Sequence, residues 1–150
     1  MYTIEEFDKA KTKVLKYVMY KKRTKLEIKN KFATDIEENL LENVLQELQE
    51  IGYINDDNYI ERSVNEYKSL KNLSRKEIKY KLMAKGISTN DWEKYYMDHE
   101  EELQEYERKS AENIVLKKMS NKEEIEIKQY LLKKGYALEY IQEAIEKIEE

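Results

Sequence analysis

Lysine and arginine side chains gather in two stretches of the sequence and are its clearest candidates for chemistry. Six basic residues and one acid lie between Lys21 and Lys31, and seven basic residues and one acid lie between Lys68 and Lys85. Ammonium and guanidinium groups at this density bind phosphates or carboxylates through charge-assisted hydrogen bonds. The two stretches therefore predict a surface that binds an acidic partner.

Acidic side chains are concentrated elsewhere in the chain. Ile36–Glu50 holds five acids and no base, and Asp91–Glu107 holds eight acids against Lys94 alone. One interpretation is a dipolar surface that fits a partner. The other is that opposite charges on neighbouring helices pair in solvent, for about 0–1 kcal/mol per exposed pair. We favour the first for the surface as a whole, because the basic bias recurs along the chain.

The residues suited to catalysis or metal binding are few. His99 is the one histidine of the 150 residues, and no nucleophile or second metal ligand stands beside it in the sequence. There is no cysteine for a thiolate site and no glycine-rich loop to cradle a phosphate. We expect His99 to lie on the surface of an acidic helix. We also expect the protein to have no metal, no cofactor and no enzymatic activity.

The 13 tyrosines are the main aromatic residues of the chain. Most of them fall on apolar helical stripes, which predicts packing between helices with the hydroxyl left at the surface. Tyr20 and Tyr80 border the basic stretches and are the candidates for stacking on a nucleic-acid base.

A short motif recurs along the chain. Glu27–Lys29 is repeated as Glu77–Lys79 and as Glu126–Lys128, at offsets of 50 and 49 residues. The second and third copies extend to EIKYKLMAKGI and EIKQYLLKKGY, which are identical at six of eleven positions. Regular spacing of this kind predicts three structural repeats.

Local signals indicate that each copy of the motif lies on a helix. A Ser or Thr followed three residues later by Glu is a capping-box pattern, in which each side chain bonds the other's backbone N–H. Such patterns begin at Thr24, Ser74 and Ser120. Glycine adopts the left-handed conformation that ends many helices, so Gly52, Gly86 and Gly135 are predicted helix ends. The chain has no proline to interrupt a helix.

Further amphipathic helices are predicted on both sides of the basic ones, for example at Glu5–Tyr20 and Ile36–Ile51. The fold is therefore predicted to be all-α, with three tandem three-helix-bundle repeats at residues 1–54, 55–99 and 100–150. Repeats of about fifty residues are too small for a large core of their own. We expect them to support one another in a curved, elongated array.

No apolar run approaches the ~20 residues of a membrane span, and the N-terminus lacks the pattern of a secretion signal. We therefore expect a cytoplasmic protein that makes no membrane contact.

Several segments resemble the RecX family of small helical proteins. Glu50–Arg62 resembles the RecX junction between the first and second repeats, with an Ile-Gly-Tyr-Ile-Asn-Asp core. Weaker matches to the family's motifs for the first, second and third repeats are Arg23–Ile28, Arg75–Ile87 and Tyr130–Tyr136. The resemblance covers about Val14 to Ile148. One departure is the first repeat, where Thr34-Asp35-Ile36 stands in place of the Lys-Gly-aromatic ending.

The resemblance implies a function. RecX-like proteins bind RecA filaments on single-stranded DNA and inhibit the recombinase, ATPase and coprotease activities of RecA, which modulates DNA repair and the SOS response. We expect this chain to act as a monomer on the RecA filament, and single-stranded DNA within the filament is a further candidate partner. The candidate residues for binding RecA or DNA are Lys21, Lys22, Arg23, Lys25, Arg62, Arg75, Lys76, Lys79 and Lys81.

Two other functions remain open. The chain could bind DNA directly through tandem helical bundles, without RecA, in which case binding to naked DNA would fall steeply with salt. It could also be a helical-repeat adaptor for another protein, which would leave the RecA ATPase unchanged.

Overall fold

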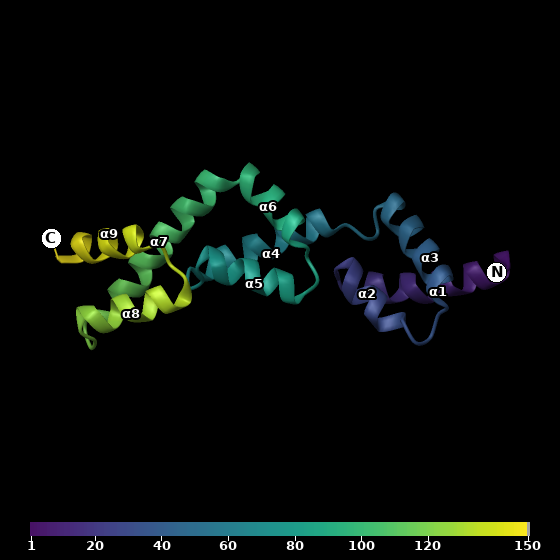
Figure 1. The fold of residues 1–150 in the computed structure, drawn as a ribbon, viewed down its shortest axis with the longest axis horizontal. Coiled ribbons are helices and arrows are strands. Elements are labelled where there is room, and N and C mark those ends of the chain that lie inside the picture. Colours follow the sequence, from purple (N-terminus) through teal and green to yellow (C-terminus); the bar gives the residue numbers. More distant parts are fainter. Residues whose placement is uncertain (150) are drawn as a thin grey trace.

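The computed structural model describes residues 1–149 and is built from α-helices, with nine helices and no strand in that part of the chain (Figure 1). The all-α prediction is confirmed. The helices are α1 (Ile4–Tyr20), α2 (Lys25–Phe32), α3 (Glu38–Ile51), α4 (Asp56–Leu70), α5 (Arg75–Ala84), α6 (Thr89–Asp98), α7 (Glu100–Lys118), α8 (Glu124–Lys134) and α9 (Leu138–Glu149).

The molecule is elongated, with the N-terminus at one end and α8 and α9 at the other (Figure 1). Its buried apolar side chains form three separate clusters along this length. The first cluster lies among α1, α2 and α3, and the third lies among α7, α8 and α9. The middle cluster lies among α4, α5 and α6 and also takes Leu103 and Tyr106 from α7. Each core is therefore small, as expected for short helices that bury one face each.

The expected division into repeats at residues 1–54, 55–99 and 100–150 stays a prediction. Glu150, the last residue of the expected third repeat, lies outside the described residues. In residues 1–149 no helix has both the length and the apolar character that crossing a bilayer requires.

Two of the three predicted capping boxes are present. The hydroxyls of Thr24 and Ser74 cap α2 and α5, and the carboxylates of Glu27 and Glu77 return to the cap backbone. The third prediction is wrong, because α8 begins at Glu124 and Ser120 lies in the turn before it. The amides of Asn121 and Lys122 both donate to the carbonyl of Lys118, so Ser120 belongs to the turn that ends α7 and does not cap α8.

The predicted glycine helix ends are confirmed, since Gly52, Gly86 and Gly135 all have φ near +100°. His99 differs from expectation, because it separates α6 from α7 instead of lying within one acidic helix. Its ring is stacked on Tyr95, with centroids 4.0 Å apart, and its Nδ1 lies 2.9 Å from the Tyr95 carbonyl oxygen. These contacts hold the His99 side chain against α6, where α6 ends and α7 begins.

Candidate partner-binding surface and the joints that shape it

The capping hydroxyls of α2 and α5 also join distant parts of the chain. Thr24 Oγ1 accepts from the Glu27 amide and donates to the carbonyl of Lys85, at 2.5 Å. Ser74 Oγ repeats this arrangement by donating to the carbonyl of Lys134, at 2.7 Å. The C-terminal end of α5 thus lies on the N-terminal end of α2, and that of α8 lies on the N-terminal end of α5.

These two contacts place α8, α5 and α2 one after another along the long axis (Figure 1). We call these three helices the middle-helix row. We call the Thr24–Lys85 contact the first joint and the Ser74–Lys134 contact the second joint. Each joint brings the partially positive N-terminal end of one helix to the partially negative C-terminal end of the next, which is the favourable orientation of their dipoles.

Glycine is required at both joints for a reason beyond its backbone angle. A Cβ added to Gly86 would lie 2.7 Å from Leu26 Cβ, and one added to Gly135 would lie 3.0 Å from Lys76 Cβ. A Cβ added to Gly52, which is at no joint, would have no neighbour within 4 Å. The glycines of the two Lys-Gly endings therefore allow one helix end to approach the next.

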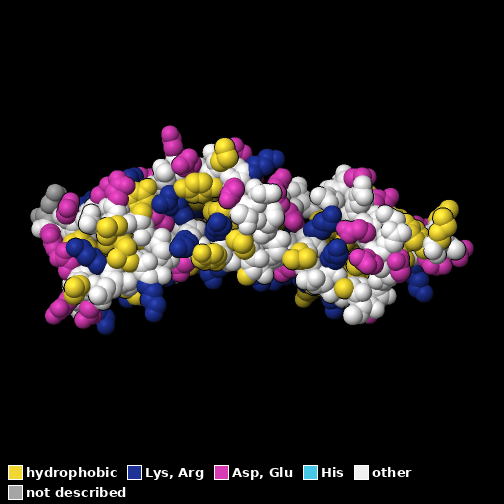
Figure 2. Space-filling model, viewed as in Figure 1, with side chains coloured by type: hydrophobic (Ala, Val, Ile, Leu, Met, Phe, Trp, Pro, Cys, Tyr) yellow, Lys and Arg dark blue, Asp and Glu magenta, His cyan; other side chains and the backbone are white. Residues whose placement is uncertain are grey.

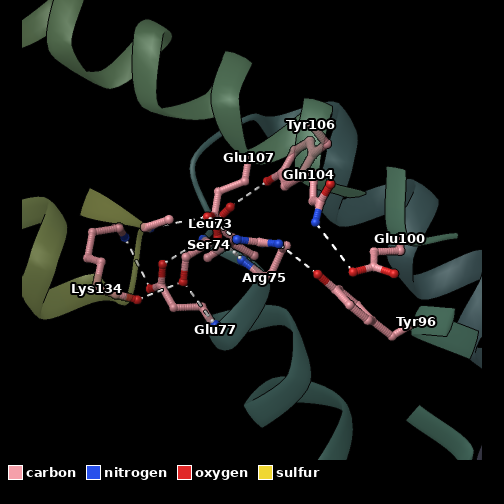
Figure 3. Close-up of polar contacts among 11 residues, drawn as sticks. Leu73, Ser74, Arg75, Glu77, Tyr96, Glu100, Gln104, Tyr106, Glu107 and Lys134 are labelled. Carbon is pink, nitrogen blue, oxygen red and sulfur yellow. Dashed lines mark hydrogen bonds and ion pairs between the residues drawn. The ribbon is translucent and has the colours of Figure 1, made fainter. Parts of the chain in front are cut away.

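The second joint is built around a buried carboxylate, that of Glu107 in α7. Its side chain is 1% exposed, and it accepts from the amide of Arg75 at 2.8 Å and from Arg75 Nη2 at 3.0 Å (Figure 3). Glu107 also accepts from the amide of Ala137, at 3.2 Å. A buried charge is tolerated when it is paired and hydrogen-bonded in this way.

The guanidinium of Arg75 is held from several sides. Its Nη1 donates to the hydroxyl of Tyr96 at 2.6 Å, and its Cζ lies 5.3 Å from the centroid of the Tyr140 ring. Burial alone would lower the pKa of Arg75, but the hydrogen bond and charge of Glu107 raise it above the ordinary value. Arg75 therefore links α5 to α6, α7 and α9.

Further polar groups close the second joint. Lys134 Nζ donates to Glu77 Oε2 at 3.1 Å, and Tyr106 Oη donates to the Leu73 carbonyl at 2.7 Å (Figure 3). The hydroxyls of Ser110 and Tyr136 lie 2.6 Å apart in the interior, and burial raises the pKa of Tyr136. The second joint is thus a connected network of internal hydrogen bonds.

The first joint has fewer polar contacts. Asp56 Oδ1 accepts from the amide of Lys25 at 2.9 Å, in the role that Glu107 has at the second joint. Burial raises the pKa of Asp56, and the hydrogen bond from the Lys25 amide offsets part of this effect. Lys22 Nζ donates to Asn58 Oδ1 at 2.6 Å. The guanidinium of Arg23 lies 3.9 Å over the Tyr17 ring, within the first cluster of helices.

The nine candidate binding residues fall into two groups by place. Eight of them lie on α2 and α5 or on the segment that leads into α2: Lys21, Lys22, Arg23, Lys25, Arg75, Lys76, Lys79 and Lys81. Arg62 lies apart from them, exposed on α4. Figure 2 shows basic side chains spread along the length of the visible face, between hydrophobic groups. The middle-helix row therefore carries five of the nine candidates, on helices that follow one another along the long axis.

The candidates also differ in whether they are already paired. Only Arg75 forms an ion pair with a carboxylate within residues 1–149, so its guanidinium serves the second joint. The opposite charges that do pair between helices include Lys29 with Glu42, at 3.5 Å, and Arg108 with Glu143, at 2.8 Å. Charge pairing between helices thus occurs, but it leaves most cations of the two basic stretches without a carboxylate in the described part of the chain. The binding role of all nine residues stays a prediction.

Lys76 and Lys79 line a hollow of about 380 Å³ beside the second joint, together with Trp92 and Tyr96. Lys22 and Arg23 line a second hollow, of about 400 Å³, beside the first joint. Each joint thus has a depression next to it with basic side chains on its rim.

Glu107 is the structural residue that reasoning from the sequence missed, because it falls within a stretch of eight acids. Its spacing carries a usable signal, since Leu103, Glu107, Ser110 and Ile114 all fall on the buried stripe of α7. An acid at an apolar position of an amphipathic helix needs an internal partner. The second bond of each capping hydroxyl has no local signal, because its acceptor lies 60 or 61 residues away.

Comparisons with known proteins agree on one family. The chain is 30% identical over 139 residues to "Regulatory protein RecX" of Staphylococcus carnosus (strain TM300), and the match covers 90% of this chain and 52% of that protein. It is 27% identical over 148 residues to "Regulatory protein RecX" of Clostridioides difficile (strain 630), covering 96% of this chain and 70% of that one. The chain thus spans about half the length of the Staphylococcus relative. No family model matches the sequence.

Solved structures give the same result for the fold. A crystal structure of RecX from Lactobacillus salivarius superposes with a TM-score of 0.80 at 27% identity, covering 98% of this chain and 99% of that one. A second crystal structure, of a regulatory protein RecX, has a TM-score of 0.80 at 23% identity and shares the fold. The sequence matches and the shared fold agree that this chain is similar to proteins of the RecX family.

Proposed function

We propose that this chain is a RecX-type regulator that binds the RecA filament on single-stranded DNA and inhibits the recombinase, ATPase and coprotease activities of RecA. The proposal rests on the similarity of the chain to two relatives that are named RecX regulatory proteins. The observation that carries it is the middle-helix row, an elongated element whose candidate cations, Arg75 excepted, have no carboxylate partner in residues 1–149. In this proposal the chain acts by binding, in the cytoplasm and as a monomer, with no catalysis of its own.

The shape of the molecule suits a filament. The middle-helix row contains helices of 8, 10 and 11 residues, which correspond to roughly 45 Å of helix at about 1.5 Å per residue. Three small bundles on one rod, the expected repeats at 1–54, 55–99 and 100–150, would each make a weak contact with the partner. Weak contacts linked on one body reinforce each other through a high effective concentration.

A titration of the DNA-stimulated RecA ATPase tests this function. We expect the rate of ATP hydrolysis to fall as the chain is added at amounts below or equal to RecA. An unchanged rate would favour the helical-repeat adaptor instead. Tight binding to naked single-stranded DNA, with the same affinity when RecA is absent, would favour direct DNA binding without RecA.

Charge reversal tests the role of the row. The triple variant Lys76→Glu, Lys79→Glu, Lys81→Glu changes three residues that form no ion pair in residues 1–149, and it spares Arg75 at the joint. The matched control is Lys9→Glu, Lys13→Glu, Lys16→Glu, which changes three exposed lysines of α1 by the same charge. We expect the row variant to lose inhibition and the control to keep it. Equal inhibition by both variants would remove these row residues from the interface.

A further inference from the structure

A groove lies between α5 and α8, next to the second joint, and Lys76 of the middle-helix row is part of its lining. Its volume is about 580 Å³, which is within the range of sites that accept a side chain or a small ligand. Tyr80, Tyr130 and Leu132 supply its apolar surface, and they are 57%, 42% and 47% exposed. Three large apolar side chains left this open, next to each other, form a surface suited to a partner.

The charge of the groove is opposite to that of the whole chain. Three lysines and one glutamate line it, whereas the chain as a whole has a net charge of -4. The glutamate, Glu77, is already occupied by Lys134 Nζ at 3.1 Å and by the amide of Ser74 at 2.9 Å. Lys76 and Lys133 line the groove and pair with no carboxylate in residues 1–149. The groove therefore attracts an anionic ligand.

The surroundings of Tyr130 favour a peptide over a nucleic acid. Lys118 Nζ lies 4.3 Å and Lys134 Nζ lies 5.6 Å from the centroid of its ring. A nucleobase that stacked on a ring face covered by either ammonium group would have to displace a cation–π contact. A carboxylate-bearing chain would instead approach the lysines directly and place an apolar side chain beside the rings.

We propose that this groove binds an acidic peptide segment of a partner protein, with one apolar side chain placed among Tyr80, Tyr130 and Leu132. Carboxylates on either side of that apolar residue pair with Lys76 and Lys133. The inference rests on the proposed function in one respect, which is that the partner is a protein.

A fluorescence-anisotropy titration of the full chain tests the groove. The probe is a fluorescein-labelled synthetic peptide with one phenylalanine between runs of glutamate and aspartate. We expect it to bind, and we expect the same peptide with serine in place of phenylalanine to bind roughly tenfold more weakly, because the apolar anchor is lost. A labelled oligothymidine serves as the nucleic-acid comparison.

Two variants change the groove in different ways. Lys76→Glu with Lys133→Glu should weaken peptide binding by tenfold or more at low salt, because two attractive charges become repulsive. Leu132→Ser should weaken it by roughly tenfold without a change of charge. The matched control, Lys13→Glu with Lys16→Glu on α1, should bind the peptide as the unaltered chain does. Thermal melting checks that each variant is folded. If the double lysine variant is unfolded, the peptide affinity of Leu132→Ser tests the groove by itself.

Three outcomes would overturn the inference. They are no peptide binding, equal loss of binding in the groove and control variants, and tighter binding of oligothymidine that the groove variants weaken. The titration contains no RecA, so a negative result leaves the ATPase test of the proposed function standing. A negative ATPase result likewise leaves the peptide titration standing.

Discussion

Replacing Glu107 by alanine should destabilise the protein by several times as much as removing a carboxylate from a surface ion pair. The substitution leaves the guanidinium of Arg75 without its carboxylate and leaves the amides of Arg75 and Ala137 without their acceptor. Removing one partner of a buried ion pair typically costs about 3–5 kcal/mol. We expect a loss near the lower end of that range, because the Arg75 side chain is 21% exposed and water can reach part of it.

Urea unfolding followed by far-ultraviolet circular dichroism measures this loss. Glu107→Gln should cost less than Glu107→Ala, because the amide oxygen of glutamine can still accept a backbone hydrogen bond. Glu105→Ala is the matched control on the same helix. Glu105 is 52% exposed and pairs with Arg108 at the surface, so its removal should cost no more than about 1 kcal/mol. A similar, small loss for Glu107→Ala and Glu105→Ala would refute the assignment of Glu107 as the centre of the second joint.

Three further predictions concern the first joint and its controls. Gly86→Ala should lower the free energy of unfolding in urea by about 1 kcal/mol or more beyond the loss for Gly52→Ala. Both glycines have φ near +100°, but only a Cβ at Gly86 would meet the Cβ of a neighbouring residue. Equal losses would contradict the close approach at the joint. Thr24→Ala should lower the free energy of unfolding by about 1 kcal/mol more than Thr3→Ala does. Both hydroxyls cap a helix, but only that of Thr24 also donates to the carbonyl of Lys85. Equal losses in the same assay would show that this second hydrogen bond contributes nothing. Asp56→Asn should be more stable than the unaltered chain at neutral pH and should lose this advantage in acid. Because burial raises the pKa of Asp56 in the folded state, the contribution of Asp56 to stability falls as the pH rises above its ordinary pKa near 3.8. Unfolding at several pH values checks this, and an advantage independent of pH would refute it.

The helical fold could be predicted well from local features of the sequence. The hydroxyl-to-glutamate spacing at Thr24 and Ser74 and the glycines at helix ends act over a few residues, and the structure confirms them. The same pattern at Ser120 does not form a capping box, because Ser120 lies in the turn that ends α7. A capping box depends on where the preceding helix ends, and the pattern itself does not contain that information.

The joints could not be predicted, because they depend on contacts between residues far apart in the sequence. The amide of Arg75 meets Glu107, and the hydroxyl of Ser74 meets the carbonyl of Lys134 60 residues away. The sequence predicts that Arg75 faces a partner, because it lies in a basic stretch. Charge counting cannot distinguish an arginine at an internal joint from a free lysine such as Lys76, since the difference lies in what packs beside each residue.

Binding of fluorescently labelled chain to RecA on single-stranded DNA with nucleotide, compared with DNA alone, tests most directly whether the cations of the middle-helix row bind a RecA filament. We expect tight binding to the filament and weak binding to naked DNA. We also expect filament binding to be lost when Lys76, Lys79 and Lys81 are reversed in charge but not when Lys9, Lys13 and Lys16 are. Filament binding that survives reversal of the row, or that the α1 control weakens equally, would contradict this role of the cations.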